Sequence, residues 1–303
     1  MAGGHAHHHH HHVSPDADEG KLAIALALIV ALMALEVVVG AVNSSLALLS
    51  DAAHMLADAA AIALALVAAR LARRPAAGQL TYGLKRAEIL SAQFNGATLL
   101  VVALLIVYEG VRRLADPPSV PGTPLVVVAL IGVVVNLAAS YTLSRADRRS
   151  LNVEGAFQHV LTDLAAFALT AVAGVAILAT GFHRADGIAA LLIAAIMLRA
   201  AYGLLKASGR VFLEAAPEGT DVAAIGRAMA AVPGVCEVHD LHVWEVTSGF
   251  PALSAHVIVR RETDCHAIRR GLEELLHGRF ELQHTTLQVD HEGGELLAIE
   301  PTP

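Results

Sequence analysis

Charged side chains are scarce in this sequence. Only 16% of its 303 residues are Asp, Glu, Lys or Arg, whereas 55% are hydrophobic and the mean hydropathy is +0.58. An ordinary soluble domain carries more charge and fewer apolar residues than this. The composition therefore argues against a simple soluble domain and indicates a membrane protein.

The sequence also lacks HExxH, the motif that gives a metalloprotease two zinc-binding histidines and a general base. Its absence argues against an intramembrane metalloprotease, and we predict that the protein is not an enzyme. Cysteine is nearly absent as well. Cys236 and Cys265 both fall in a C-terminal segment whose predicted location is cytoplasmic, where structural disulfides are rare. We interpret both cysteines as free thiols, and a role in metal binding is the weaker alternative.

Long apolar stretches are abundant. Each has roughly the 20 residues that a helix needs to cross a bilayer core about 30 Å thick, and their approximate ranges are 22–40, 45–69, 87–111, 124–143, 155–181 and 187–205. No small-residue cleavage site follows the first stretch, so it does not read as a signal peptide. We predict an α-helical membrane domain of six transmembrane helices over residues 21–209, after an N-terminal tail over residues 1–20.

Basic residues gather on one side of these stretches. Eleven Lys and Arg residues precede the first stretch or follow the second, fourth and sixth, whereas three lie on the other side. Loops rich in Lys and Arg stay in the cytoplasm. We therefore predict a multi-pass protein of the cell membrane, in bacteria the inner membrane, with both termini in the cytoplasm.

Residues 210–303 differ from the rest, with seven basic and fifteen acidic residues and no apolar run long enough to span a membrane. Periodicity and turn residues predict an αββαβ order, with helices near 220–231 and 264–277 and strands near 236–246, 252–260 and 284–290. This order suits a ferredoxin-like or metallochaperone-like α+β domain. A domain this small buries a modest core, so we expect a homodimer.

Ionisable residues interrupt two apolar stretches. Asp51, His54 and Asp58 follow one another at spacings of three and four, which places them on one helix face. His159 and Asp163 repeat the HxxxD spacing in the fifth stretch. An Asp in the middle of a membrane helix costs on the order of 3 kcal/mol, so these groups are expected to face a partner or a water-filled cavity.

Two interpretations of the repeated HxxxD pattern remain. In the first, each His forms a structural hydrogen bond with its neighbouring Asp. In the second, which we favour, the two pairs face each other and supply two imidazole nitrogens and two carboxylates, the ligands of a four-coordinate zinc site. Such ligands must lose protons to bind metal, so a metal/proton antiporter would have a use for them.

SLALLSDAAHMLADA and NVEGAFQHVLTDLAA, together with the predicted spans and tail, resemble the cation diffusion facilitator family. The resemblance covers residues 20 to 291 and implies a proton-coupled exporter of divalent cations with a dimerising cytoplasmic domain. It places the transport site on His54, Asp58, His159 and Asp163. A His at the first position is similar to the zinc-transporting branch. Alternatives are export of Cd2+, Co2+ or Fe2+, or a membrane-anchored metal sensor.

The resemblance also implies a regulatory Zn2+ site in the tail, on His239, His256 and Asp290, with His266 as a less secure member. Gln288 stands where some relatives have a further His. The other tail histidines are interpreted as surface residues: His242, His277, His284 and His291.

Two further features have open interpretations. Asp51 is predicted either to orient His54 from a second shell or to line an exit path for the metal. The six histidines at positions 7–12 are either a purification tag or a disordered metal-gathering tract. The predicted partners are divalent metal ions, protons and the lipid bilayer, and no nucleic acid.

Overall fold

A computed structural model describes residues 15–42, 46–117 and 122–293 of the chain. It divides into two compact units between Ser208 and Gly209. The first unit is helical, and the second combines helices with a small sheet. Residues 7–12, with their six histidines, lie outside the described part of the chain.

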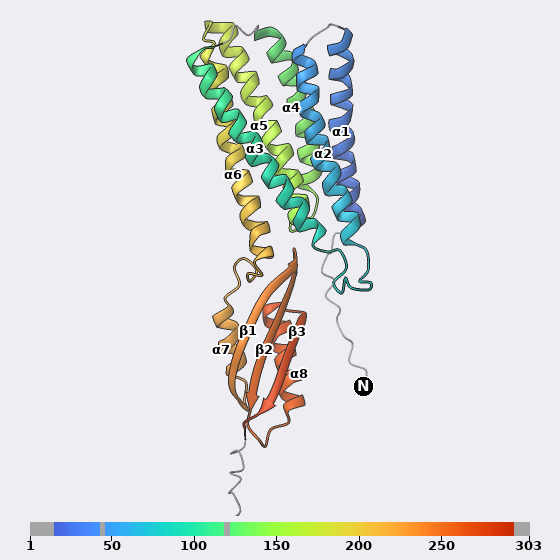
Figure 1. Cartoon of the computed structure of the whole chain (residues 1–303), viewed down its shortest axis with the longest axis vertical. Coiled ribbons are helices and arrows are strands. Elements are labelled where there is room, and N and C mark those ends of the chain that lie inside the picture. Colours follow the sequence, from blue (N-terminus) through green and yellow to red (C-terminus); the bar gives the residue numbers. More distant parts are fainter. Residues whose placement is uncertain (1–14, 43–45, 118–121, 294–303) are drawn as a thin grey trace, which may run out of the picture. The chain divides into compact units, whose positions relative to one another are not determined.

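The helices of the first unit form a bundle (Figure 1). They are α1 (Pro15–Val42), α2 (Leu46–Ala72), α3 (Ala87–Ala115), α4 (Gly122–Ser144), α5 (Leu151–Thr180) and α6 (Arg184–Phe212). Within the described residues, four segments are long and apolar enough to cross a membrane: Ala87–Ala115, Val126–Ser144, Leu151–Thr180 and Arg184–Phe212. A helix of about 20 residues spans the hydrocarbon core, so the unit is a multi-pass membrane domain.

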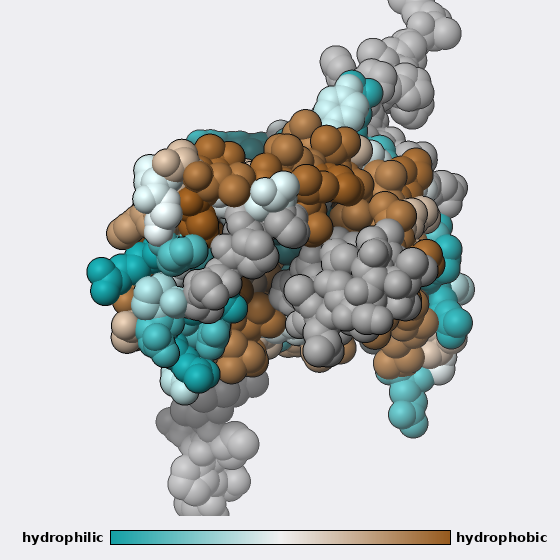
Figure 2. Space-filling view, turned by 90° about the horizontal axis from the view of Figure 1, so that it is seen from above, coloured by the Kyte–Doolittle hydropathy of each residue, from teal (hydrophilic) through white to brown (hydrophobic). Residues whose placement is uncertain are grey.

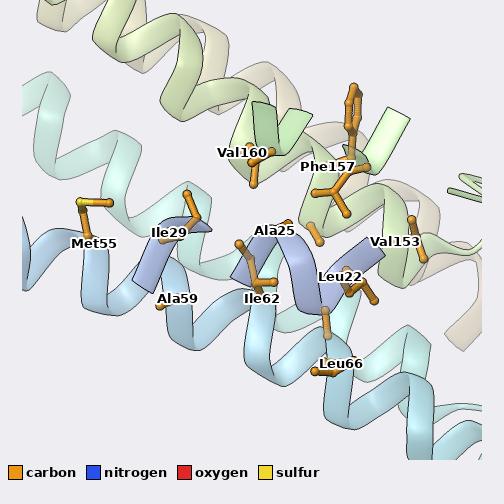
Figure 3. Close-up of a cluster of buried hydrophobic side chains, with 14 of the residues drawn as sticks. Leu22, Ala25, Ile29, Met55, Ala59, Ile62, Leu66, Val153, Phe157 and Val160 are labelled. Atoms are coloured by element: carbon orange, nitrogen blue, oxygen red, sulfur yellow. The ribbon is translucent and has the colours of Figure 1, made fainter. Parts of the chain in front are cut away.

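One buried apolar cluster of the bundle is built by residues of α1, α2, α4 and α5. Figure 3 shows Ile29 of α1, Ile62 of α2 and Val160 of α5 among the buried apolar side chains of this cluster. Apolar residues also cover the outside. Leu105 and Val134 are more than 60% exposed, and Figure 2 shows hydrophobic side chains around the periphery of the bundle. An apolar exterior of this extent is the surface that a lipid bilayer covers.

Helices α3 and α6 are held together near the end of α3. A Cβ added to Gly187 would lie 3.2 Å from the carbonyl oxygen of Gly110, so this contact depends on glycine. Beside it, the Arg113 guanidinium bonds to Asp186 of α6 at 2.6 Å and to Glu109 of its own helix at 3.0 Å. The close backbone contact and the ion pair therefore both hold α3 against α6.

The second unit contains α7 (Val222–Ala230), β1 (Val235–Thr247), β2 (Phe250–Val259), α8 (Cys265–Phe280) and β3 (His284–His291), in that order. Strand β2 lies in the centre, antiparallel to β1 and parallel to β3. Both helices cover one face of this sheet. Residues of α7 and α8 share a buried cluster with alternate residues of β2: Ile225, Met229, Leu272, Leu276, Leu253, Ala255, Val257 and Val259. The intervening residues of β2 belong to the other face.

Candidate metal centre

Asp58 of α2 and His159 and Asp163 of α5 come together inside the membrane domain. One ligand atom from each of the three lies within 4.8 Å of the other two. His159 Nε2 is 2.8 Å from Asp58 Oδ1. Asp58 is 7% exposed and His159 is 5% exposed, so both are buried, and Asp163 is half-buried. Three of the four residues predicted for the transport site are thus placed side by side by the fold.

Regular helix geometry explains how the two helices build this cluster. His159 and Asp163 are four residues apart on α5 and therefore occupy the same helix face. That face meets α2, where Ala59 and Ile62 belong to the same buried core as Val160 of α5. Small and branched apolar side chains around the cluster keep it away from lipid and bring Asp58 within reach of His159.

The cluster combines two carboxylates with one imidazole. Two carboxylates held this close repel each other unless a cation or a proton lies between them. A divalent cation satisfies both, and imidazole and carboxylate are common zinc ligands. The arrangement can therefore hold either a metal ion or protons, and the two compete for the same atoms.

His54 and Asp51 belong to α2 by their backbone, but their side chains lie outside the described part of the structure. His54 precedes Asp58 by four residues, about one turn of the helix that carries both. Its role as a fourth ligand and the role of Asp51 behind it therefore stay predictions.

Sequence reasoning missed a group of buried polar residues near this cluster. Asn95 of α3 and Asn152 of α5 are fully buried, and Ser91 of α3 is 3% exposed. The Asn152 amide donates to the carbonyl oxygen of Ala65 in α2 at 2.7 Å. The sequence did contain one signal for this group. Asn152 precedes His159 by seven residues, or two turns, and therefore lies on the same face of an apolar helix.

A second group of potential ligands lies in the sheet unit. His239 of β1 pairs with His256 of β2 across the antiparallel ladder. With Asp240 they offer ligand atoms that lie within 4.8 Å of one another. His256 Nδ1 is 3.6 Å from Asp240 Oδ2, and His239 Nδ1 is 3.3 Å from Glu237 Oε1. Asp240 was not among the predicted ligands.

An irregularity in β1 gives Asp240 this position. The register of β1 against β2 shifts between His239 and His242, and Asp240 has a φ of +49°. A non-glycine residue in this left-handed region is uncommon, although Asp tolerates it better than most residues. The bulge places the Asp240 carboxylate beside His256.

Asp290 and His266 are not members of this group of three. Gln288 of β3 is the residue opposite His256, and its amide donates to Asp290 Oδ2 at 2.8 Å. Asp290 is opposite Ile258, two pairs further along the strands. His266 is the second residue of α8, on the helix-covered side of the sheet, and its backbone N–H donates to Asp264 Oδ1. The structure thus brings together two of the four predicted tail ligands.

Both cysteines are free thiols. The Cys236 thiol donates to Glu292 Oε1 at 2.7 Å, and this bond raises the pKa of the thiol. Cys265 is half-buried and packs beside the core of the sheet unit. Neither thiol belongs to a cluster of potential metal ligands within the described residues.

Comparisons with known proteins cover both units of the chain. A family model described as the cation efflux transmembrane domain matches residues 22–213. A second model, described as the cytoplasmic domain of cation efflux proteins, matches residues 217–292.

Several relatives are similar over nearly their full length. The cation efflux system protein CzcD of Alcaligenes sp. is 40% identical over 280 residues, which cover 91% of this chain and 88% of that protein. A protein of Bacillus subtilis named cadmium, cobalt and zinc/H(+)-K(+) antiporter is 36% identical, with 91% and 90% covered. The zinc transporter ZitB of Escherichia coli is 35% identical, with 91% and 89% covered.

Among the solved structures that are similar to part of the chain is a cytoplasmic domain of a related transporter. It is the metal-bound C-terminal domain of the CzcD transporter from Cupriavidus metallidurans, with 32% identity. The matched region covers 23% of this chain and 97% of that domain, and the TM-score is 0.23.

Proposed function

Because the chain belongs to the cation diffusion facilitator family of cation efflux transporters, we propose that it exports Zn2+ from the cytoplasm in exchange for protons. The protein is a transporter and not an enzyme. The observation that carries the proposal is the group of Asp58, His159 and Asp163 inside a membrane domain, with Asp58 and His159 buried. Ionisable groups at such a depth are costly and mark ion pathways.

The contact between His159 and Asp58 supports proton coupling. A distance of 2.8 Å between Nε2 and Oδ1 is that of a hydrogen bond, which requires a proton between the two atoms. The same two atoms are the ones that would bind a metal ion. A cation that binds to both must displace that proton, and a proton that returns must weaken the hold on the cation. A metal ion and a proton therefore cannot both occupy the position between His159 Nε2 and Asp58 Oδ1.

Zinc is favoured by the types of ligand. A mixed set of imidazole and carboxylate with a low ligand number suits Zn2+, whereas Ca2+ and Mg2+ prefer six or more oxygen ligands. With His54 as a fourth ligand the set would have two imidazoles and two carboxylates. The names of the relatives agree, since they include zinc alone and zinc with cadmium and cobalt. We therefore place Zn2+ first and Cd2+, Co2+ or Fe2+ after it.

For the topology, we propose six membrane-spanning helices, with both termini in the cytoplasm of a bacterium and the αββαβ tail as a dimerisation domain. The basic residues around the ends of α2 and α4 support this orientation. A compact tail of fewer than 100 residues supports self-association. His239 and His256, with Asp240 as a third ligand, would bind a regulatory Zn2+ there, and Asp290 and His266 are the further candidates.

Counter-transport in proteoliposomes tests the proposed function. The full chain would be reconstituted with a pH-sensitive dye inside, and Zn2+, Cd2+, Co2+ or Fe2+ would be added outside in separate runs. We expect Zn2+ to move against protons, with the Asp163→Ala variant as the inactive control. Zinc uptake without any change in internal pH would contradict proton exchange, and no uptake of any of the four ions would contradict the transport function itself.

A further inference from the structure

Three buried polar side chains lie where α2, α3 and α5 contact one another. Asn95 and Asn152 are 0% exposed and Ser91 is 3% exposed. Among the described residues, both polar atoms of Asn95, Oδ1 of Asn152 and Oγ of Ser91 have no protein partner. An unpaired buried polar group costs roughly 1–3 kcal/mol. Three such residues in a membrane domain call for a functional explanation.

Their position is fixed relative to the Asp58, His159 and Asp163 cluster. Asn152 donates to the carbonyl oxygen of Ala65 at 2.7 Å. Ala65 comes seven residues after Asp58 on α2, and Asn152 comes seven residues before His159 on α5. Seven residues are two helical turns, or about 10 Å along the axis, and return to the same face. The Asn152 contact thus repeats the Asp58–His159 contact between the same helices, about 10 Å away.

Helix α3 brings its polar groups to the same place. A Cβ added to Gly155, one turn after Asn152, would lie 3.6 Å from the Asn95 amide nitrogen. Asn95 therefore packs against α5 between Asn152 and His159. Ser91 lies one turn before Asn95 on the same face of α3. Two successive turns of α3 and the first turn of α5 thus present buried polar side chains at one place between the helices.

The polar groups continue to the end of the bundle where α3 and α5 begin. The hydroxyl of Ser150, which precedes α5, donates to Glu88 Oε2 at 3.3 Å. Glu88 belongs to the first turn of α3 and precedes Asn95 by seven residues. Polar side chains therefore mark a line from this end of the helices to the cluster.

We propose that Ser91, Asn95 and Asn152 form a transit site, which a partly hydrated divalent cation occupies on its way between the beginning of α3 and α5 and the Asp58, His159 and Asp163 cluster. The inference rests on the proposed function. Amide and hydroxyl oxygens are hard, neutral ligands that bind a cation directly or through its water. Without a carboxylate they hold it weakly, and an ion in transit requires sites that it can both enter and leave.

The test is zinc flux into proteoliposomes by the full chain carrying Asn95→Leu. Leucine has a similar size but offers no oxygen, so the initial rate should fall about tenfold or more, as expected when an ion loses a contact worth 1.4 kcal/mol. Thr98→Val on the same helix is the matched control, because the Thr98 hydroxyl donates to Phe94 of its own helix. This control should transport at the wild-type rate.

Equilibrium binding separates a transit site from a structural role. Zinc binding would be measured by competition with a chelating dye. The same measurement on a protein that carries Asp163→Ala would be subtracted, so that only zinc bound at the Asp58, His159 and Asp163 cluster is counted. For Asn95→Leu we expect this affinity to stay within about twofold of wild type, a change of less than 0.5 kcal/mol. Asn95→Gln, which keeps an oxygen, should restore part of the flux.

The possible failures can be told apart. Wild-type flux in Asn95→Leu would overturn the transit site, and so would a parallel loss of flux and affinity, since Asn95 would then shape the metal cluster itself. If Asn95→Leu does not fold, Asn152→Asp replaces it. Its added charge should bind zinc more tightly and slow the flux, and unchanged binding and flux would overturn the proposal. Absence of flux in the wild-type chain would overturn the proposed function together with this inference.

Discussion

His239 and His256 face each other across β1 and β2, with ring centroids 5.4 Å apart and ring planes at 84°. The Asp240 carboxylate reaches the same point because β1 bulges between His239 and His242. Two imidazoles and one carboxylate thus converge at one place on β1 and β2.

The first prediction follows from these three residues. Zinc should raise the melting temperature of the fragment 210–303, because a ligand that binds only the folded form stabilises it, by about 2.7 kcal/mol at a concentration of 100 times the dissociation constant. His256→Ala should weaken this response. Thermal melts of the fragment with and without zinc measure it.

Further variants locate the third ligand. Asp240→Ala should weaken the zinc response more than Asp290→Ala, since Asp290 bonds to Gln288 and lies two pairs beyond His256 along the strands. His277→Ala on the exposed side of α8 is the control and should melt like wild type at each zinc concentration. Equal melting with and without zinc in the wild-type fragment would show that the tail histidines are surface residues.

The second prediction concerns the start of α8. Asp264 accepts hydrogen bonds from the backbone N–H groups of Ala267 and His266, and these bonds lower its pKa from the ordinary value of 3.8. A carboxylate with a lowered pKa stabilises the fold above its unfolded pKa, and this contribution disappears as the pH falls through the lower folded value. Asp264→Ala should therefore lower the melting temperature at neutral pH and lose its effect at acidic pH.

Melts of wild type and Asp264→Ala from about pH 7 down to about pH 3 measure this difference, over the range in which a free Asp carboxyl protonates. Asp264→Asn is the control, because Asn caps a helix without a charge that titrates. It should melt above Asp264→Ala at every pH. A constant gap between wild type and Asp264→Ala down to the lowest pH would show that the cap does not depend on ionisation.

The third prediction tests the membrane cluster. Asp163→Ala should abolish zinc flux, because the site loses one of the two carboxylates that offset the charge of a divalent cation, whereas the fold rests on long apolar helices. Size-exclusion profiles in detergent should match wild type. Asp116→Ala, an exposed aspartate just after α3, is the control and should transport normally. Near-normal flux in purified Asp163→Ala would remove it from the transport site.

The fourth prediction concerns protons. Zinc and protons compete for the same atoms of Asp58 and His159, so zinc affinity should fall as the pH is lowered from about 8 to about 6, where imidazole gains its proton. Calorimetry in buffers of different ionisation enthalpy would count the protons released on binding. The protein used would lack residues 1–20 and the tail ligands. An affinity that does not change with pH would exclude proton competition and thus the antiport mechanism.

In the tail, the periodicity of apolar residues along the sequence was enough to predict the strands. Its strands were expected near 236–246, 252–260 and 284–290, and they are found at Val235–Thr247, Phe250–Val259 and His284–His291. Alternation of apolar and polar residues predicts a strand that buries one face, and the turn at Gly249 limits two of them. The predicted and observed ends differ by at most two residues, because the last backbone hydrogen bonds depend on partner strands.

The grouping of the candidate ligands could be predicted where helix spacing alone decides it. Four residues separate His159 from Asp163, so their common face follows from any α-helix. Asp240 could not be found in this way, because a regular strand would point it away from His239, and only the bulge in β1 reverses that. The position of Asn95 beside α5 could not be predicted for another reason. Its surroundings depend on which helix packs beside α3, and a single amphipathic pattern does not specify the neighbour.

The hydrogen bond between Asp58 and His159 also has a consequence for biosynthesis. The ribosome makes Asp58 101 residues before His159, so in the proposed six-helix topology α2 enters the bilayer before its carboxylate can bond with that imidazole. An isolated Asp in a membrane helix costs on the order of 3 kcal/mol. Helix α2 is therefore expected to stay next to the insertion machinery, or to lie shallow in the membrane, until α5 has been synthesised and can receive it.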